Sequence, residues 1–350
     1  MKYEYLKEYL RPYWKGQQVF RESVLFCTDQ SGVQLPARLL YPPEEICSVI
    51  SATTQTEYAA QTDYLFEDGK LLCAPGSRIP CQPYAALYPS EALENHSMNR
   101  TGGGYIYFSE GPVFHHMQTL VTYRHAASWD GPVPENKSAL LPRTTSLLRS
   151  GCAPKILVLG DSVTEGANSS GPIGEPPYLG SWWQLAGAYL EETFGLTIPL
   201  NSVAMGGQIS SWGAAQAPEA SAKYHPDLVI IAFGMNDGTH KVPPQEFRDN
   251  IRRTLDTFRA DRPETEFILV GSILPNPEAV DFVGFQRENR DMLLTLEGEG
   301  VAVADVTQMH EAFLRHKAYR DMTGNNVNHL NDFSARMQAQ VVLATLGVLD

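Results

Sequence analysis

Ile156-Leu-Val-Leu-Gly-Asp-Ser162-Val-Thr-Glu-Gly166 is an apolar run that ends in a Gly-Asp-Ser turn. The run predicts a buried strand, and the turn places Ser162 just beyond its carboxyl end. A serine hydroxyl is an effective nucleophile only when a base takes its proton and donors stabilise the oxyanion. The Gly-x-Ser-x-Gly elbow of α/β-hydrolases is not present, because no glycine stands two residues after the serine. Taken alone, the turn indicates a helix-capping serine more often than a nucleophile.

Residues 151–350 alternate between apolar runs and helical stretches. The apolar runs cover residues 155–160, 197–204, 227–234, 266–273 and 301–306. This alternation predicts an α/β fold with a parallel sheet and crossover helices. Ligands of such sheets bind beyond the carboxyl ends of the strands. We therefore expect Ser162, after the first run, and Asn236, after the third, to lie at the same edge.

Three further positions are candidates for partners of the serine. The amide of Asn236 could donate to an oxyanion, a contribution of about 3 kcal/mol when preorganised, although a turn residue is an equally good interpretation. Gly207 would let the backbone approach a ligand closely, with a plain turn as the alternative. His329 stands in a short loop before an amphipathic helix, and this fixed position suits a general base.

These blocks follow one another in a recognisable order: Gly160-Asp-Ser162, Gly206-Gly207, Gly234-Met-Asn236-Asp237 and His329. In this combination, residues 154–350 resemble the SGNH (GDSL) hydrolase superfamily. The resemblance implies a flavodoxin-like three-layer α/β/α fold with a five-stranded sheet, Ser162 as nucleophile and His329 as general base and acid. The backbone N–H groups of Ser162 and Gly207 and the amide of Asn236 would form the oxyanion hole, with the glycine ambiguous by one residue.

One position departs from the pattern of this superfamily. An aspartate usually stands three residues before the histidine, and this chain has Asn326 there. An amide oxygen can orient an imidazole but offers no charge to the imidazolium. Three outcomes are open: a Ser-His dyad helped by Asn326 or by a backbone carbonyl, a carboxylate from elsewhere, or an inactive descendant. We expect the dyad, with Asp305 as the first choice for a substitute carboxylate and with Asn331 or Asp332 as the cap of the last helix.

Residues 1–150 have a different character. Apolar residues at helical spacing predict a short helix within residues 3–14, and residues 17–127 contain short β-prone runs between turn signals. This pattern favours an N-terminal β-sandwich or jelly roll, followed by a linker over residues 128–154. We place a β-rich accessory domain at 1–150 and a catalytic domain at 151–350. A β-rich domain ahead of such a core resembles the arrangement of some two-domain carbohydrate esterases in the superfamily.

Composition narrows the classes of partner and compartment. The net charge is −13 and the basic residues are scattered, which argues against nucleic acid and anionic membranes as partners. Neither a signal peptide nor an apolar stretch of 18 residues is recognisable in the sequence, so a cytoplasmic protein is expected. The five cysteines contain no Cys-x-x-Cys pair and fit free thiols. We expect neither a metal nor a cofactor, and leave the oligomeric state, including a homo-oligomer, open.

The leading functional hypothesis is a carboxylic ester hydrolase that removes short acyl groups, acetyl above all, from a small molecule or an oligosaccharide. Trp182, Trp183 and Trp212 follow the serine and glycine blocks and are candidates for stacking on a sugar or an acyl chain, with packing in the core as the alternative. A lipid or thioester acylhydrolase of the same superfamily is a second hypothesis. A non-catalytic carbohydrate-binding protein with a vestigial site is a third.

Overall fold

A computed structural model describes residues 3–349 of the chain, and its centre is a parallel sheet. The strand order is β11-β10-β12-β13-β14, in which β10 lies between β11 and β12. This order confirms the predicted flavodoxin-like α/β fold. The strands β10, β12, β13 and β14 are buried and rich in Val, Ile and Leu, as expected where helices cover both faces, whereas the edge strand β11 is partly exposed. Their bounds are β10 Ile156–Gly160, β11 Leu200–Ala204, β12 Leu228–Ala232, β13 Glu266–Val270 and β14 Val301–Ala304.

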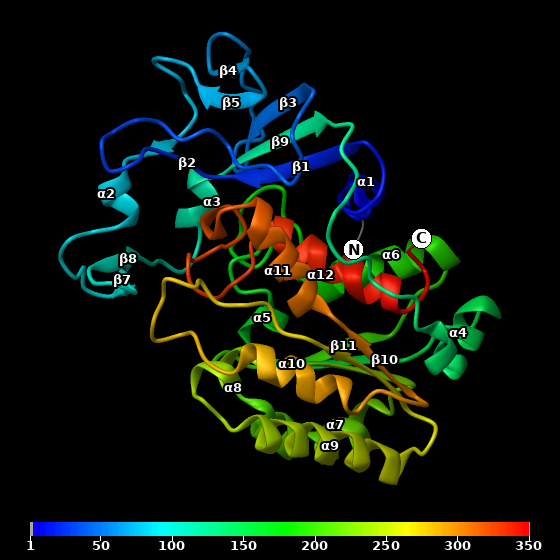
Figure 1. Cartoon of the computed structure of the whole chain (residues 1–350). Helices are drawn as coiled ribbons and strands as arrows, with labels where there is room; N and C mark the ends of the chain where they lie inside the picture. The colour runs from blue at the N-terminus through cyan, green and yellow to red at the C-terminus, as the bar shows by residue number, and fades with distance from the viewer. Residues whose placement is uncertain (1–2, 350) are drawn as a thin grey trace.

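Helices cover both faces of this sheet (Figure 1). One face packs against α7 (Ser210–Tyr224), α9 (Pro244–Asp261) and α10 (Gln286–Leu294) through a separate apolar cluster. In α9, Phe247, Ile251, Leu255 and Phe258 form the buried stripe that is typical of an amphipathic helix. The other face packs against α6 (Trp182–Phe194), α11 (Val306–His316) and α12 (Asp332–Thr345).

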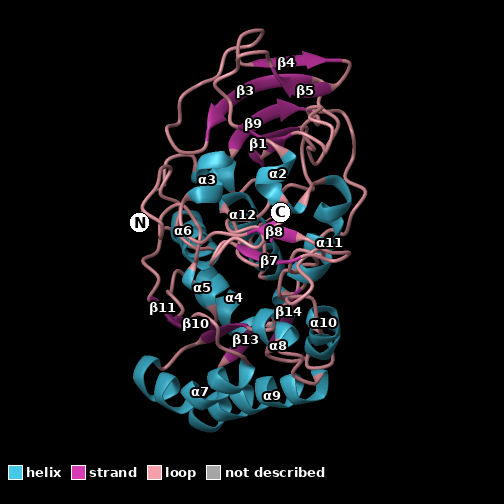
Figure 2. Ribbon diagram, turned by 90° about the vertical axis from the view of Figure 1, so that its left-hand side faces the viewer, coloured by secondary structure: helices cyan, strands magenta, loops and turns pink. Residues whose placement is uncertain are grey.

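The helix α12 is buried on all sides. Every residue from Phe333 to Thr345 is buried, which is unusual for a helix on the face of a sheet. The reason is a second sheet, formed by β1 (Gln18–Val24), β9 (Thr119–Arg124) and β3 (Glu45–Ser51) in the order β1-β9-β3, which lies beyond α12 (Figure 2). A single apolar cluster runs from this sheet through α12 to the parallel sheet. The N-terminal region and the α/β unit therefore share one core.

The remainder of the N-terminal region consists of short elements. It is β-rich, as predicted, but its strands form the three-stranded antiparallel sheet and three two-stranded pairs in place of two large facing sheets. The helix predicted within residues 3–14 is confirmed as a single turn, α1. The elements are α1 Leu6–Tyr9, β2 Phe26–Cys27, β4 Tyr64–Glu67, β5 Lys70–Cys73, β6 Cys81–Gln82, α2 Tyr84–Leu87, β7 Ser97–Asn99, β8 Tyr105–Tyr107 and α3 Val113–Met117.

Buried charges tie the N-terminal sheet to the α/β unit. Nζ of Lys317, just after α11, lies 2.6 Å from Oε1 of Glu22 on β1, and both side chains are fully buried. Arg336 on α12 donates to the backbone carbonyls of Tyr9, Phe20 and Arg21. A charge removed from water is tolerated only when it is paired and hydrogen-bonded, so these contacts fix how the two regions pack.

The segment over residues 128–154 contains η1 (Ser138–Leu140) and α4 (Pro142–Arg149). The N–H of Lys137 donates to the carbonyl of Thr345, which holds the segment against the end of α12. Within residues 3–349, no helix is long and apolar enough to cross a bilayer. The five cysteines are free thiols.

Candidate active site

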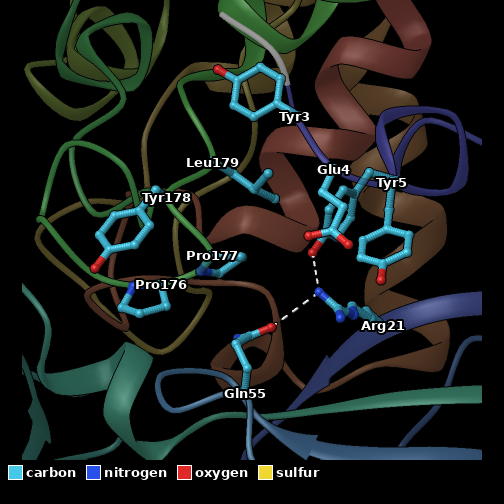
Figure 3. Close-up of a pocket in the computed structure, with 10 residues that line it drawn as sticks. Tyr3, Glu4, Tyr5, Arg21, Gln55, Pro176, Pro177, Tyr178 and Leu179 are labelled. Carbon is cyan, nitrogen blue, oxygen red and sulfur yellow. Dashed lines mark hydrogen bonds between the residues drawn. The ribbon is translucent and has the colours of Figure 1, made fainter.

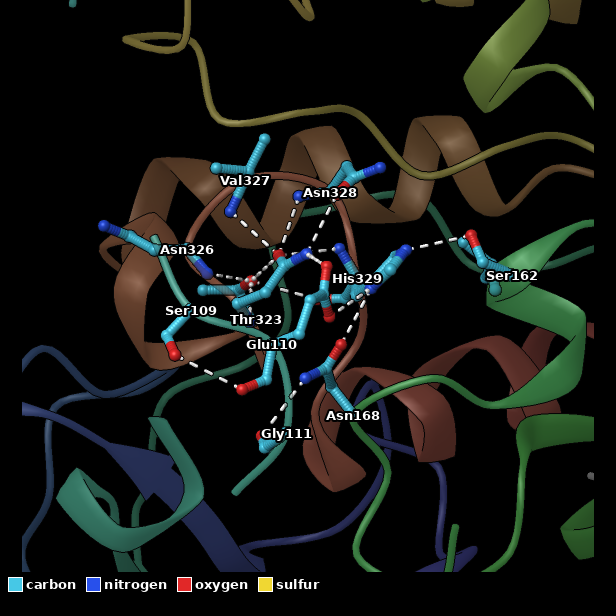
Figure 4. A network of polar contacts seen from close by, with 12 residues as sticks. Ser109, Glu110, Gly111, Ser162, Asn168, Thr323, Asn326, Val327, Asn328 and His329 are labelled. Carbon is cyan, nitrogen blue, oxygen red and sulfur yellow. Dashed lines mark hydrogen bonds and ion pairs between the residues drawn. The ribbon is translucent and has the colours of Figure 1, made fainter. Parts of the chain in front are cut away.

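Ser162 is the first residue of α5 (Ser162–Glu165), directly after β10. Asp161 caps this helix by accepting a hydrogen bond from the N–H of Val163 at 3.0 Å. Gly160 allows the tight turn, because a Cβ there would lie 2.0 Å from Oγ1 of Thr164. The turn brings Oγ of Ser162 to 2.9 Å from Nε2 of His329 (Figure 4). The predicted nucleophile and the predicted base are thus within hydrogen-bonding distance.

The loop that carries His329 is organised by Asn325. Oδ1 of Asn325 accepts hydrogen bonds from the N–H groups of Val327, Asn328 and His329 at 3.0–3.1 Å. Oγ1 of Thr323 donates to the carbonyl of His329 at 2.9 Å. Asn325 is fully buried, so water cannot replace these contacts. Hydrogen bonds to the backbone of this loop therefore fix the position of His329, in addition to any contact made by its ring.

Two oxygen atoms face the other ring nitrogen of His329. Nδ1 lies 2.7 Å from Oδ1 of Asn168 and 3.1 Å from Oε2 of Glu110. Both are acceptors, so Nδ1 carries the proton and Nε2 is free to accept one from Ser162. Burial raises the pKa of Glu110, but its hydrogen bond with His329 and the charge of that residue outweigh burial and leave the pKa below its ordinary value.

The geometry does not bring Asn326 to His329. The amide of Asn326 donates to the carbonyl of Tyr107 at 3.0 Å, and its backbone adopts φ 70°. The expectation that this side chain orients the imidazole is therefore wrong, because it points toward β8 instead.

The two aspartates considered as replacements are also engaged elsewhere. Asp305 pairs with Arg290 and caps α11. Asp332 accepts the N–H of Ser170 at 2.8 Å, while Asn331 caps α12. The choice of Asp305 as the substitute carboxylate is wrong, and of the two residues expected to cap the last helix, Asn331 is the cap and Asp332 is not.

The predicted oxyanion donors lie around the turn at Ser162. As the first residue of α5, Ser162 has a backbone N–H without an acceptor inside the helix. The amide of Asn236 donates to the carbonyl of Gln208 at 3.0 Å and lies 3.4 Å from Oδ2 of Asp161. A Cβ at Gly206 would lie 3.7 Å from Cβ of Ser162, whereas one at Gly207 would point into open space. Gly206 is thus the glycine that borders the serine, and Gly207 supplies the left-handed turn at φ 74°.

Buried carboxylates hold the elements that carry these donors. Asp237 in α8 (Met235–Thr239) accepts hydrogen bonds from the N–H and the hydroxyl of Ser210, at the start of α7. Burial raises the pKa of Asp237, against the effect of those hydrogen bonds. Burial likewise raises the pKa of Asp161 to about 7, against the N–H of Val163 and the charge of His329. The carboxylate of Asp237 thus connects α8, the helix that carries Asn236, to the start of α7.

The three tryptophans proposed as a substrate platform contribute to packing. Trp182 is fully buried in the large core cluster, so its assignment to substrate binding is wrong. Trp183 packs against the same cluster and donates its indole N–H to the carbonyl of Thr164 at 2.8 Å. Trp212 packs edge-on against Phe233, in the cluster on the opposite face of the sheet. Trp183 links the helix α6 to α5 and so helps to hold the turn that carries Ser162.

A cavity of about 560 Å³ lies between the N-terminal segment and the loop over residues 176–179 (Figure 3). Its lining includes Tyr5, Arg21 and Tyr178. Neither Ser162 nor His329 lines this cavity, so it is separate from the serine site.

Sequence reasoning missed three residues of the site: Glu110, Asn168 and Asn325. Glu110 lies in the N-terminal region, 219 positions before His329, and no spacing in the sequence connects the two. Asn168 follows the serine block closely, and this proximity is the one signal in the sequence that points to it. Asn325 adjoins the position where the superfamily pattern places a carboxylate.

The sequence of the chain is similar to those of several known proteins. The profile of the GDSL-like Lipase/Acylhydrolase family matches residues 158–336. An arylesterase of Vibrio mimicus is 31% identical over 111 residues, covering 31% of this chain and 51% of that protein. An acetylxylan esterase / glucomannan deacetylase of Cellvibrio japonicus is 28% identical over 192 residues, covering 47% and 53%. The thioesterase 1/protease 1/lysophospholipase L1 of Escherichia coli K12 is 26% identical over 116 residues, covering 33% and 50%.

The chain spans about half the length of these curated relatives. Among solved structures, a two-domain esterase (CEX) active on acetylated mannans is 19% identical with a TM-score of 0.46, covering 60% of this chain and 53% of that one. A carbohydrate esterase family 3 protein of Talaromyces cellulolyticus is 16% identical with a TM-score of 0.43, covering 54% and 94%. Because the family profile extends over residues 158–336, just over half of the sequence, this chain belongs to the GDSL-like lipase/acylhydrolase family.

Proposed function

We propose that the protein is a serine esterase that hydrolyses short-chain esters, with acetyl esters of carbohydrates as the leading substrate class. The observation that carries this proposal is the 2.9 Å contact between Oγ of Ser162 and Nε2 of His329. The proton on Nδ1, fixed by the acceptors that face it, leaves Nε2 as the basic nitrogen. This arrangement is that of a nucleophile and its general base.

In the acylation step, His329 Nε2 takes the hydroxyl proton as Oγ of Ser162 attacks the ester carbonyl carbon. The carbonyl oxygen becomes an oxyanion, stabilised by the N–H of Ser162, a glycine N–H from Gly206 or Gly207, and the amide of Asn236. The intermediate collapses when His329 returns its proton to the leaving alkoxide. The products of this step are a free alcohol and an acyl-Ser162 ester.

In the deacylation step, water takes the place of the alcohol. His329 accepts a proton from the water as its oxygen attacks the acyl carbon, and the same oxyanion donors act again. Collapse transfers the proton to Oγ of Ser162 and releases the carboxylic acid. The cycle consumes one water for each ester and needs no metal or redox partner.

The preference for short acyl groups rests on the similarity to a carbohydrate deacetylase. A Cellvibrio japonicus relative is an acetylxylan esterase / glucomannan deacetylase, and its similarity covers 47% of this chain.

The free cysteines fit a reducing compartment, and we propose the cytoplasm on that basis.

A panel of 4-nitrophenyl esters with increasing acyl length tests the acyl preference, and acetylated xylo- and manno-oligosaccharides test the carbohydrate. We expect activity to be highest on acetyl esters and to fall steeply with chain length. A preference for long acyl chains or acyl thioesters would instead support the second hypothesis, which the Escherichia coli relative favours.

Covalent labelling distinguishes an esterase from a non-catalytic binding protein. We expect a fluorophosphonate probe to modify Ser162, located by peptide mass spectrometry, because the reagent needs an activated serine. An unlabelled Ser162 in folded protein would contradict the proposal and favour the vestigial site.

A further inference from the structure

We propose that Glu110, from the N-terminal β-rich region, is the carboxylate whose negative charge stabilises the protonated form of His329. The inference rests on the proposed esterase function and assigns a role that the usual pattern of this superfamily gives to an aspartate in the histidine loop. It makes residues before 150 part of the active site.

The segment around Glu110 is tied to the histidine loop and to the nucleophile side at once. Oε1 of Glu110 accepts a hydrogen bond from the amide of Asn325 at 3.0 Å, and Oε2 lies 3.1 Å from Nδ1 of His329 (Figure 4). The next residue, Gly111, accepts a hydrogen bond from the amide of Asn168 at 3.2 Å. Each carboxylate oxygen therefore has its own partner, which fixes the orientation of the group.

The two groups at Nδ1 have different chemical capacities. Asn168 is the closer at 2.7 Å and orients the ring, but its amide is neutral. When His329 takes the proton of Ser162 it becomes an imidazolium, and a nearby negative charge stabilises that form more strongly than a neutral acceptor does. We therefore assign a separate role to each residue. Asn168 orients the ring of His329, and Glu110 supplies the negative charge that stabilises the imidazolium.

Other carboxylates do not replace Glu110. Asp305 is paired with Arg290, and Asp332 is held by the N–H of Ser170. Asp161 also interacts electrostatically with His329, but burial raises its pKa to about 7, so it is incompletely ionised near neutral pH. Of these carboxylates, Glu110 is the one in contact with the ring.

The position of Glu110 also limits the size of its effect. Its side chain is 50% exposed, whereas that of His329 is 11% exposed. Water screens a half-exposed charge. Replacing the buried aspartate of trypsin by asparagine costs about 10⁴ in kcat, and we expect a smaller loss here, of about 10- to 100-fold.

The test compares Glu110→Gln with Glu110→Asp in the full-length protein. Gln keeps the size and the acceptor for Asn325 but removes the charge, whereas Asp keeps the charge. We expect kcat for an acetyl ester to fall in the order wild type, Glu110→Asp, Glu110→Gln, with KM little changed. The acidic limb of the pH profile of kcat/KM should move to lower pH in Glu110→Gln, because the imidazolium loses its counter-charge.

The matched control is Glu175→Gln, which removes the charge of a glutamate that lies 2.9 Å from a different histidine, His116. It should leave kcat and the pH profile unchanged. A Glu110→Gln variant with wild-type kcat and an unshifted profile would overturn the inference while leaving the esterase proposal intact. A purely structural role, which would also overturn it, would lower the melting temperature and the activity of both Glu110 variants without moving the pH limb. A wild-type protein that neither reacts with the fluorophosphonate nor cleaves esters would overturn both proposals.

Discussion

Glu110 and His329 are 219 positions apart in the sequence, and their side chains lie 3.1 Å apart. The contact joins the loop between β8 and α3 to the loop before α12. It is possible because α12 lies between the two sheets and shares its core with both. The architecture of the whole chain, and not the α/β unit alone, therefore determines what faces the histidine.

Asn326→Asp tests whether an aspartate at the position that is usual in the superfamily would increase activity in this chain. The amide of Asn326 donates to the carbonyl of Tyr107, so a carboxylate there would lose a donor and face an acceptor. We expect no increase in kcat and a loss of about 1–3 kcal/mol in the free energy of unfolding. Urea denaturation and ester kinetics measure the two quantities. A large gain in activity would mean that the loop rearranges to bring residue 326 to His329.

Asp161→Asn tests the buried carboxyl beside the nucleophile. Its pKa rises from 3.8 to about 7 on folding because burial disfavours the charged form. Well below pH 3.8 the group is protonated in both the folded and the unfolded state, so it does not change the free energy of unfolding. As the pH rises toward 7, the unfolded state ionises more readily, so wild-type stability falls.

The Asp161→Asn variant keeps an oxygen that can cap α5, but it has no carboxyl group to titrate at this position, so the stability of the variant should not fall as the pH rises. We expect it to be more stable than wild type above pH 7 and to lose that advantage near pH 4, with about 1.4 kcal/mol for each unit of pKa difference. Melting temperatures across this pH range check the prediction, and the exposed Asp256→Asn on α9 is the control. A difference that is independent of pH would contradict it.

Asn325→Ala tests the organisation of the histidine loop. The change leaves three backbone N–H groups and one oxygen of Glu110 without their partner. We expect a loss of about 1–3 kcal/mol in unfolding free energy and a marked fall in kcat, because His329 is no longer held. The exposed Asn99→Ala should change neither quantity. Wild-type activity in Asn325→Ala would show that the loop is held by other contacts.

Lys317→Met tests the buried ion pair between the two regions. The variant leaves Glu22 buried with its hydrogen bonds from Tyr123 and Leu40 but without its counter-charge. We expect a loss of about 3–5 kcal/mol in the free energy of unfolding. Equilibrium denaturation measures it, and adding Glu22→Gln should recover part of the loss. Full stability in the single variant would contradict the role given to the pair.

The sequence predicts those strands, helices and site residues that are marked by a pattern in neighbouring residues. Apolar runs with alternating helices predict the parallel sheet, and four short blocks predict that Ser162, Asn236 and His329 lie near the same strand ends. Trp182 is misassigned because the sequence does not distinguish an aromatic side chain that faces the substrate from one that is buried in the core next to the site. Glu110 cannot be found from the sequence, since its role depends on how an N-terminal loop packs against a C-terminal one. Asn326 stands at the expected spacing, but its amide points toward β8.

The rate of acetyl ester hydrolysis by wild type and by Ser162→Ala, with Ser150→Ala as an exposed control, tests the central claim most directly. Removing the nucleophile of a serine hydrolase costs at least about 10⁴-fold in kcat. We expect Ser162→Ala to fold like wild type and to lose activity by that factor, while Ser150→Ala keeps it. Equal rates for wild type and Ser162→Ala would contradict the account.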